Sequence, residues 1–317
     1  MRDEGDHLVV DSYGSVRSVY TGRIGHVTFG AGFDRLSGYP FEVRYSQGAL
    51  QRARMSADVA ADAYRYLRGL FSEFAPDIAL IVASKADWSS TQPYGMPYFN
   101  DDQGQIRPGI LAMPSEQSVF WTEMANDIGG VSGSGYAKLL ATYANGAGDL
   151  DLQPFFDLVT IHELGHAFEV LSGLRLPTFW LGEIFANLAL HTFVATRRPR
   201  NLATLEVLPT VGVEDELFTM QIRAEGSHTL EDFESHYAGS SQQMSSRNYV
   251  WYQYRFLRLA AKIFAVDGEG GLVRFWECFR GRVGRSLNES TIPSIVRLLT
   301  TEVSETLGDA VENWREW

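Results

Sequence analysis

The sequence is poor in cysteine, in positive charge and in long apolar runs, and each shortage excludes a class of protein. Its 317 residues include one cysteine, Cys278, which rules out an intramolecular disulfide framework and a multi-cysteine zinc cluster. Lys and Arg number 27 against 39 Asp and Glu, a net charge of −12, so nucleic acid is not an expected partner. No run approaches the roughly 18 apolar residues of a membrane span.

The chain also shows no signal peptide. It begins MRDEGDHLVV, with charges where an export signal carries an apolar segment. We therefore expect a soluble protein, cytoplasmic as the sequence stands, or exported if a signal peptide has been removed from it. Cys278 lies in the helical pattern RFWECFRGR and is predicted to be a small buried side chain rather than a reactive thiol.

The first half of the chain mixes strand and helix patterns. Residues 40–46 alternate in polarity and residues 77–84 form a short continuous apolar run, as expected of strands. Residues 49–71 between them have an apolar face at helical spacing. Residues 106–114 form another strand candidate, and because Pro108 and Pro114 stand at its ends, we expect an edge strand.

The second half is predicted to be mostly helical, which gives an α+β fold class. A glycine-rich stretch, residues 129–148, is the best boundary, so we expect an α/β subdomain over 1–150 and a helical one over 151–317, with a cleft between them. The helical segments are 154–172, 178–196, 248–266, 270–279 and 304–315.

Two histidines four residues apart mark the candidate site. His162 and His166 belong to TIHELGHAF, inside a predicted helix. At 100° per residue they lie on one face, one turn apart, so both imidazoles can bind one metal ion. Glu163 is then placed to reach a water held by that metal, as in the HExxH arrangement, where the glutamate is the general base.

A catalytic zinc ion needs a third protein ligand and an open fourth position. The next predicted helix contains FWLGEIFANLALH, in which Glu183 follows His166 by seventeen residues. The apolar residues beside Glu183 indicate that this helix is not wholly exposed. Asn187 lies on the same face, four residues on, where its amide is expected to support a ligating histidine. We therefore predict one Zn²⁺ per chain, bound by His162, His166 and Glu183.

The segments HELGH and WLGEIFAN together resemble the gluzincin zinc metallopeptidases, which include the thermolysin and aminopeptidase N families. This resemblance implies a thermolysin-like zincin fold, with the active site in the cleft between the halves, and peptide-bond hydrolysis. It implies zinc-ligand roles for His162, His166 and Glu183 and the general-base role for Glu163.

The family also uses a tyrosine or histidine beyond the third ligand to stabilise the oxyanion. By this resemblance Tyr249, which opens a predicted helix 66 residues after Glu183, is the first candidate. Tyr252 is the second and Tyr254 lies in the same helix, while His228 and His236 are the remaining possibilities.

A strand lining the cleft pairs with the substrate backbone in gluzincins. The candidate here comprises Gly109, Ile110, Leu111, Ala112 and Met113. Aminopeptidases carry Gly-x-Met-Glu-Asn at this place, whereas this chain has LAMPSE. Glu116 is a weak candidate to replace the glutamate of that signature. An endopeptidase is therefore favoured over an aminopeptidase.

The expected function is a zinc-dependent peptidase acting on a peptide or protein. Three alternatives remain open at this stage. One is a zinc hydrolase whose substrate is not a peptide, and another is an inactive gluzincin-like binding protein, against which the intact Glu163 argues. The last is a helical domain without metal.

Overall fold

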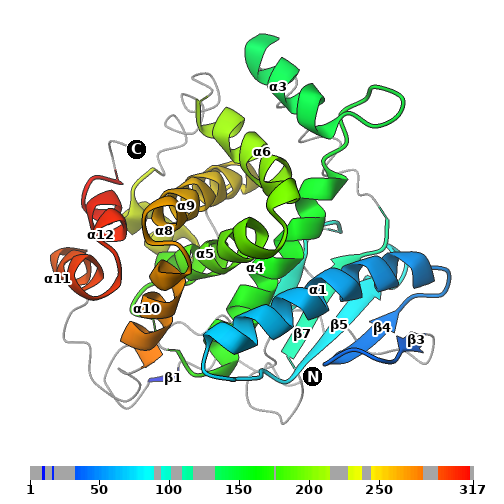
Figure 1. Cartoon of the computed structure of the whole chain (residues 1–317), viewed down its shortest axis with the longest axis horizontal. Coiled ribbons are helices and arrows are strands. Elements are labelled where there is room, and N and C mark those ends of the chain that lie inside the picture. Colours follow the sequence, from blue (N-terminus) through cyan, green and yellow to red (C-terminus); the bar gives the residue numbers. More distant parts are fainter. Residues whose placement is uncertain are drawn as a thin grey trace, which may run out of the picture.

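The computed structural model describes residues 9–10, 16–17, 33–88, 94–100, 109–116, 133–174, 176–214, 228–237, 244–280 and 292–314. Within these ranges the protein is α+β, with a mixed five-stranded sheet in the N-terminal half and a mostly helical C-terminal half (Figure 1). This confirms the predicted fold class. None of the described helices is long and apolar enough to cross a membrane.

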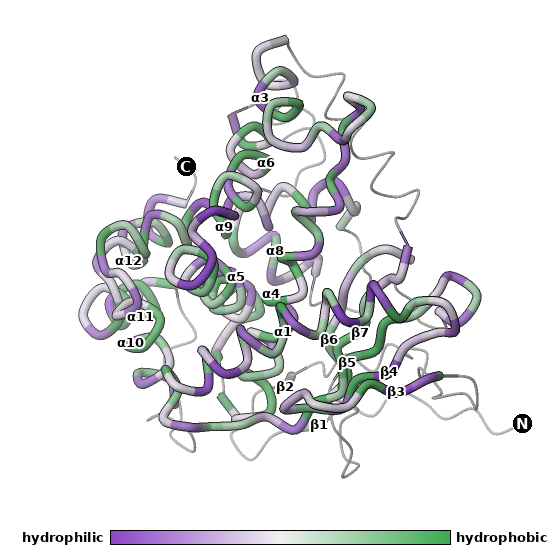
Figure 2. The backbone as a smooth tube through the Cα atoms, turned by 45° about the vertical axis from the view of Figure 1, so that its right-hand side comes forward, coloured by the Kyte–Doolittle hydropathy of each residue, from purple (hydrophilic) through white to green (hydrophobic). Residues whose placement is uncertain are grey.

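The main sheet has three parallel inner strands and an antiparallel strand at each edge. β5 is buried at every position and is hydrophobic along its length (Figure 2), as expected of a parallel strand covered on both faces. A separate antiparallel pair joins β1 (Val9–Val10) and β2 (Val16–Arg17). The order in the main sheet is β3 (Asp34–Leu36), β4 (Glu42–Tyr45), β5 (Ile78–Ala83), β7 (Gly109–Pro114) and β6 (Tyr98–Asn100).

The strand that the sequence places at the edge of the sheet is an inner strand. β7 pairs with β5 on one side and with β6 on the other. The residues Ile110, Leu111 and Ala112 have a partner on both sides, so their backbone groups are already paired. The edge prediction was therefore wrong, because Pro114 is accommodated at the end of the strand and three residues sufficed to form β6. The edge of the sheet at this side is β6.

Helix α1 (Leu50–Leu70) connects β4 to β5 and packs against the sheet. Its buried face is rich in alanine, including Ala53, Ala57 and Ala60, so the helix backbone can approach the strands closely. Leu50, the apolar residue at the start of the helix, is 37% exposed. The strand side chains under the helices, such as Leu80, alternate with those on the other face of the sheet.

The predicted helices are present, and five further short or irregular elements were not foreseen. α6 contains Pro209, which normally interrupts a helix. α3 (Gly133–Tyr143) lies within the glycine-rich stretch 129–148. Besides α1, the confirmed helices are α4 (Gln153–Leu171), α5 (Phe179–Arg197), α9 (Ser246–Asp267), α10 (Glu269–Arg280) and α12 (Glu305–Glu312). The additional elements are η1 (Pro199–Asn201), α6 (Leu202–Glu214), α8 (Leu230–Tyr237), α11 (Ile292–Leu298) and η2 (Leu299–Val303).

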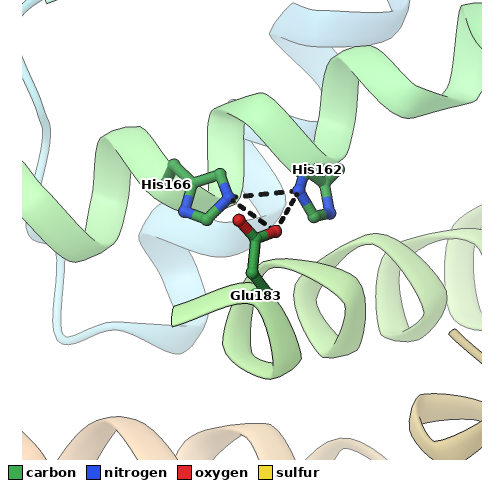
Figure 3. A group of neighbouring side chains, drawn as sticks. All are labelled: His162, His166 and Glu183. Atoms are coloured by element: carbon green, nitrogen blue, oxygen red, sulfur yellow. Dashed lines mark hydrogen bonds and ion pairs between the residues drawn. The ribbon is translucent and has the colours of Figure 1, made fainter. Parts of the chain in front are cut away.

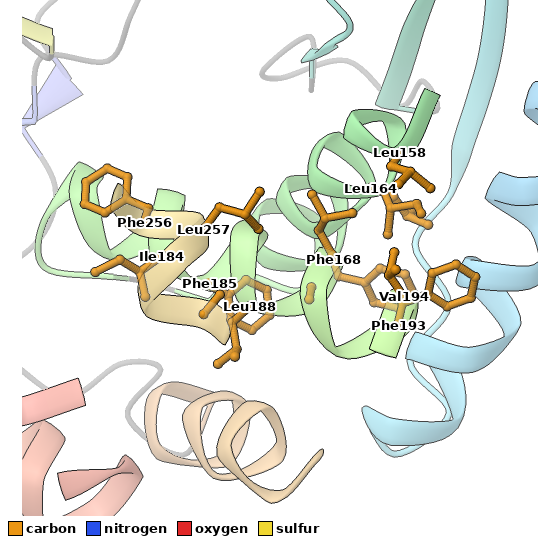
Figure 4. Close-up of a cluster of buried hydrophobic side chains, with 14 of the residues drawn as sticks. Leu158, Leu164, Phe168, Ile184, Phe185, Leu188, Phe193, Val194, Phe256 and Leu257 are labelled. Atoms are coloured by element: carbon orange, nitrogen blue, oxygen red, sulfur yellow. The ribbon is translucent and has the colours of Figure 1, made fainter. Parts of the chain in front are cut away.

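Helix α5 is the centre of the helical half. Every residue from Trp180 to Val194 is buried, and side chains of α4, α5 and α9 meet in one apolar cluster (Figure 4). The same cluster reaches the sheet face under α1, so the apolar core of the described residues is continuous across residue 150. The division into two subdomains stays a prediction. Cys278 lies on α10 as expected but is only half-buried.

Candidate metal centre

The three predicted ligands converge at the contact between α4 and α5 (Figure 3). His162 and His166 come from α4 and Glu183 from α5. The two histidine Nε2 atoms lie 3.1 Å apart. Glu183 Oε2 lies 3.2 Å from Nε2 of His162 and 3.4 Å from Nε2 of His166. Three potential ligand atoms therefore surround one point.

The glycine inside HELGH explains why the two helices meet at this depth. A Cβ added to Gly165 would lie 2.9 Å from the Cα atom of Ala186, closer than real Cβ contacts. Only glycine therefore allows the backbones of α4 and α5 to come this close. Ala186 follows Glu183 by three residues, about one helical turn, so this close approach brings the carboxylate of Glu183 to the histidines.

The donor set and its spacing fit a metal ion. Ligand atoms bound about 2.0–2.1 Å from a tetrahedral zinc ion lie about 3.3 Å from one another, close to the three distances above. The side chains of His162 and Glu183 are 6% and 5% exposed and that of His166 is 20% exposed. The group could therefore hold a metal ion, and nitrogen and carboxylate ligands suit zinc.

The charges of the neighbouring carboxylates favour positive charge at the centre. Burial raises the pKa of Glu183, but the two histidines outweigh burial and hold this pKa below its usual value. Burial lowers the pKa of His166, but Glu183 and Glu169 outweigh burial and hold it well above the usual value. Because a ligating imidazole must be neutral, a metal ion bound here would displace a proton from His166.

Glu169 orients His166. Its Oε2 lies 3.0 Å from Nδ1 of His166 and, as a carboxylate, accepts the Nδ1–H hydrogen bond, so in the neutral ring the lone pair on Nε2 faces the centre. A Cβ added to Gly182 would lie 2.9 Å from a carboxylate oxygen of Glu169. The glycine of WLGE therefore makes room for this carboxylate between the two helices.

Replacing Glu169 with alanine is expected to weaken zinc binding about 10-fold to 100-fold, the usual cost of losing such a partner of a ligating histidine. The measurement is a zinc dissociation constant from competition with a chromophoric chelator. Glu169→Gln retains an acceptor oxygen and should recover part of the loss. Equal affinity in Glu169→Ala and the unaltered protein would show that the contact does not orient the ligand.

Asn187 does not support a histidine, so this prediction was wrong. Its Nδ2 donates to the backbone carbonyl of Glu183 and to Oε1 of Gln253, both at 2.9 Å. Gln253 on α9 in turn donates from Nε2 to Oε2 of Glu183 at 2.8 Å. Asn187 therefore belongs to the surroundings of the carboxylate ligand, because α9 fills the space on that side of α5.

Glu163, the predicted general base, lies beside the ligand group and next to the edge strand. Burial raises the pKa of its carboxyl above the usual value, and the neighbouring Glu183 adds to this, while His162, His166 and a hydrogen bond from the backbone N–H of Phe99 act in the opposite direction. A raised pKa brings a carboxylate closer to the range in which it can exchange protons near neutral pH.

Tyr249 is the predicted oxyanion residue that the structure brings near the centre. It lies in the first turn of α9, whose start is capped by Ser245. Burial raises its pKa well above the usual value, and Glu183, Tyr237 and Glu163 raise it further. The phenol therefore stays protonated and remains a hydrogen-bond donor at neutral pH. Its ring stacks on that of Tyr237 from α8, with centroids 5.2 Å apart.

Tyr252 and Tyr254 are engaged elsewhere, His228 precedes α8 and His236 lies near the end of that helix. The hydroxyl of Tyr252 donates to the Thr229 carbonyl at 2.6 Å, and its ring is fully buried. The ring of Tyr254 packs against Gly212 of α6. His228 is exposed, with Nδ1 4.0 Å from the carboxylate of Asp232, and His236 is a half-buried residue of α8.

The predicted substrate strand, β7, contacts α4 near the end of the strand. Glu116, which follows the strand, bonds to other residues. Thr160 on α4 donates to the sulfur of Met113 at 2.9 Å. Glu116 accepts hydrogen bonds from the hydroxyl of Tyr94 and from the backbone N–H of Lys85. Gly109 packs closely against Phe99, which belongs to the actual edge strand, β6.

Sequence reasoning missed four groups at this centre. Glu169 could have been predicted, because it follows His166 by three residues, and residues i and i+3 of a helix are neighbours. Gln253 had a weaker one, because it follows Tyr249 by four residues and so shares its face of α9. Tyr237 and the backbone of Phe99 had none, since α8 and β6 are short and their positions depend on packing.

Comparison with models of known protein families and with curated proteins gives no match. The fold and the site define an α+β protein with a largely buried His–His–Glu group that could hold a metal ion.

Proposed function

We propose that this protein is a zinc-dependent peptidase of gluzincin type, with a thermolysin-like zincin fold. The observation that carries the proposal is the convergence of two histidines and a glutamate at 3.1–3.4 Å, with Glu163 on the same helix beside them. Helices α4 and α5 supply the ligands in the order in which the resemblance predicts them.

A zinc ion bound at such a site lowers the pKa of a bound water and polarises a substrate carbonyl. The residues of the chain perform the remaining tasks. The carboxylate of Glu163 accepts a proton from the attacking water and later donates it to the leaving amine. The hydroxyl of Tyr249 donates a hydrogen bond to the negative charge that develops on the substrate carbonyl oxygen.

The edge strand β6 provides the place for a peptide backbone. Because the N–H of Phe99 bonds to Glu163, the polar backbone groups of this residue face away from β7. An extended peptide added along this edge would donate a hydrogen bond to the Phe99 carbonyl and pass the general base, which already accepts from the Phe99 N–H. Because Glu116 is held by Tyr94 and Lys85, it is not placed to take the role of the amino-terminus-binding glutamate of aminopeptidases, and we propose an endopeptidase.

Replacing Tyr249 with phenylalanine is expected to lower kcat about 10-fold to 1,000-fold with a smaller change in KM, because the lost donor acts on the transition state. Steady-state kinetics on a peptide found by screening provide the measurement. Tyr254→Phe, which alters a buried phenol on the same helix, is the control. A Tyr249→Phe variant with unchanged kcat would remove this residue from the mechanism.

The proposal is tested by measuring zinc content together with cleavage of a random peptide library. We expect one zinc ion per chain and internal cleavage that stops when a chelator removes the metal and returns when zinc is restored. Zinc binding without cleavage of any peptide would favour a hydrolase of other substrates or an inactive binding protein. A purified protein that binds no zinc would refute the proposal.

A further inference from the structure

The third ligand is held by a closed ring of hydrogen bonds that begins and ends on Glu183. The backbone carbonyl of Glu183 accepts from Nδ2 of Asn187 at 2.9 Å. The same Nδ2 atom donates to Oε1 of Gln253 at 2.9 Å, and Nε2 of Gln253 donates to the Glu183 carboxylate at 2.8 Å. The side chain of Glu183 is 5% exposed, so water cannot easily replace these donors.

The ring determines which end of each amide faces its neighbour. A backbone carbonyl can only accept, so the amino end of Asn187 must face it. That amino group can only donate, so the oxygen of Gln253 must face Asn187. The amino group of Gln253 is thereby directed at the carboxylate of Glu183. Without Asn187, a rotation of the Gln253 amide by 180° would place its oxygen against the carboxylate instead.

The carboxylate oxygen that accepts from Gln253 is Oε2, the atom that also lies 3.2–3.4 Å from the two histidines. Gln253 therefore acts on the ligand atom itself. We propose that Gln253 is a positioning residue for the third metal ligand, and that Asn187 acts through Gln253 by setting the orientation of its amide. This inference rests on the proposed metal centre and does not depend on which substrate is hydrolysed.

The position of Gln253 on α9 gives this contact a second consequence. Gln253 follows Tyr249 by one turn of the helix, and both face the centre. The hydrogen bond to Glu183 thus ties α9 to the ligand helix α5 next to the residue proposed to bind the oxyanion. Loss of this bond is expected to disturb the geometry of the metal ligands before it affects Tyr249.

The test uses the full chain and the variants Gln253→Met, Asn187→Leu and the double variant. Methionine and leucine keep nearly the same volume and remove the amides. Zinc affinity is measured by chelator competition, and the visible absorption of the Co²⁺-loaded protein reports the ligand geometry. We expect Gln253→Met to bind zinc about 10-fold to 100-fold more weakly and to alter the Co²⁺ spectrum. Asn187→Leu should act in the same direction.

The double variant decides whether Asn187 acts through Gln253. Residues acting through one shared contact are not additive, so the double variant should bind zinc as weakly as Gln253→Met and no more. If the two losses multiply, Asn187 acts independently and that part of the inference is wrong. The control is Gln153→Met, the same substitution at the start of α4, where the amide bonds to Asp157, and it should bind zinc normally.

Wild-type affinity and an unchanged Co²⁺ spectrum in Gln253→Met would overturn the inference while leaving the proposed peptidase intact. An unaltered protein that binds no metal would instead refute the proposed function, and the inference with it. Circular dichroism of each metal-free variant tests whether it is folded. If Gln253→Met does not fold, Asn187→Leu alone decides, and normal zinc affinity in that variant overturns the role of Asn187.

Discussion

Replacing Glu163 with glutamine is expected to abolish hydrolysis while zinc remains bound. The substitution removes the carboxylate proposed to accept the proton from the attacking water, and general base catalysis contributes about 10²-fold to 10⁴-fold to rates. Glutamine is similar in size and can still accept the hydrogen bond from the Phe99 N–H, so the packing between α4 and β6 should persist. The measurements are kcat on a cleaved peptide and zinc content per chain.

Glu277→Gln is the matched control for this prediction. Glu277 is an exposed residue of α10, and the same change of charge there should leave kcat and zinc content as they are. A zinc-loaded Glu163→Gln variant with full activity would contradict the role of Glu163 as the base. Loss of zinc along with activity would show that Glu163 contributes to metal binding instead.

Replacing Glu183 with alanine is expected to remove both zinc binding and activity. Two histidines on one helix remain, without the negative charge and the third bond that complete the site. The loss in zinc affinity should exceed the roughly 100-fold that a supporting residue costs. Calorimetry with zinc gives the affinity directly, and the thermal unfolding temperature gives a second readout, because a bound metal stabilises the folded state by mass action.

In the unaltered protein, added zinc is therefore expected to raise Tm, and this rise should vanish in Glu183→Ala. Glu277→Ala provides the control, since it removes an exposed carboxylate from another helix and should retain the zinc-dependent rise. A Glu183→Ala variant whose Tm still responds to zinc at the original concentrations would show that the metal is bound elsewhere, and the proposed centre would be wrong.

The parts of this protein that could be predicted from its sequence are those governed by local geometry. The period of the α-helix places His162 and His166 on one face whatever surrounds them. The apolar run of β5 and the apolar patterns of α4, α5 and α9 likewise indicate their own conformation. The net charge and the cysteine count also follow from the sequence alone, and they limit the expected binding partners and disulfides whatever the fold.

The contacts between segments far apart in the chain were decided by packing. β7 became an inner strand because three residues of β6 paired with it. The free edge of the sheet is therefore β6, and the backbone group beside Glu163 is that of Phe99. Asn187 turned to Gln253, sixty-six residues away, because α9 rather than α4 fills that side of α5. Spacing along one helix is set by covalent geometry, whereas the partner of a buried polar group is set by which helix packs over it.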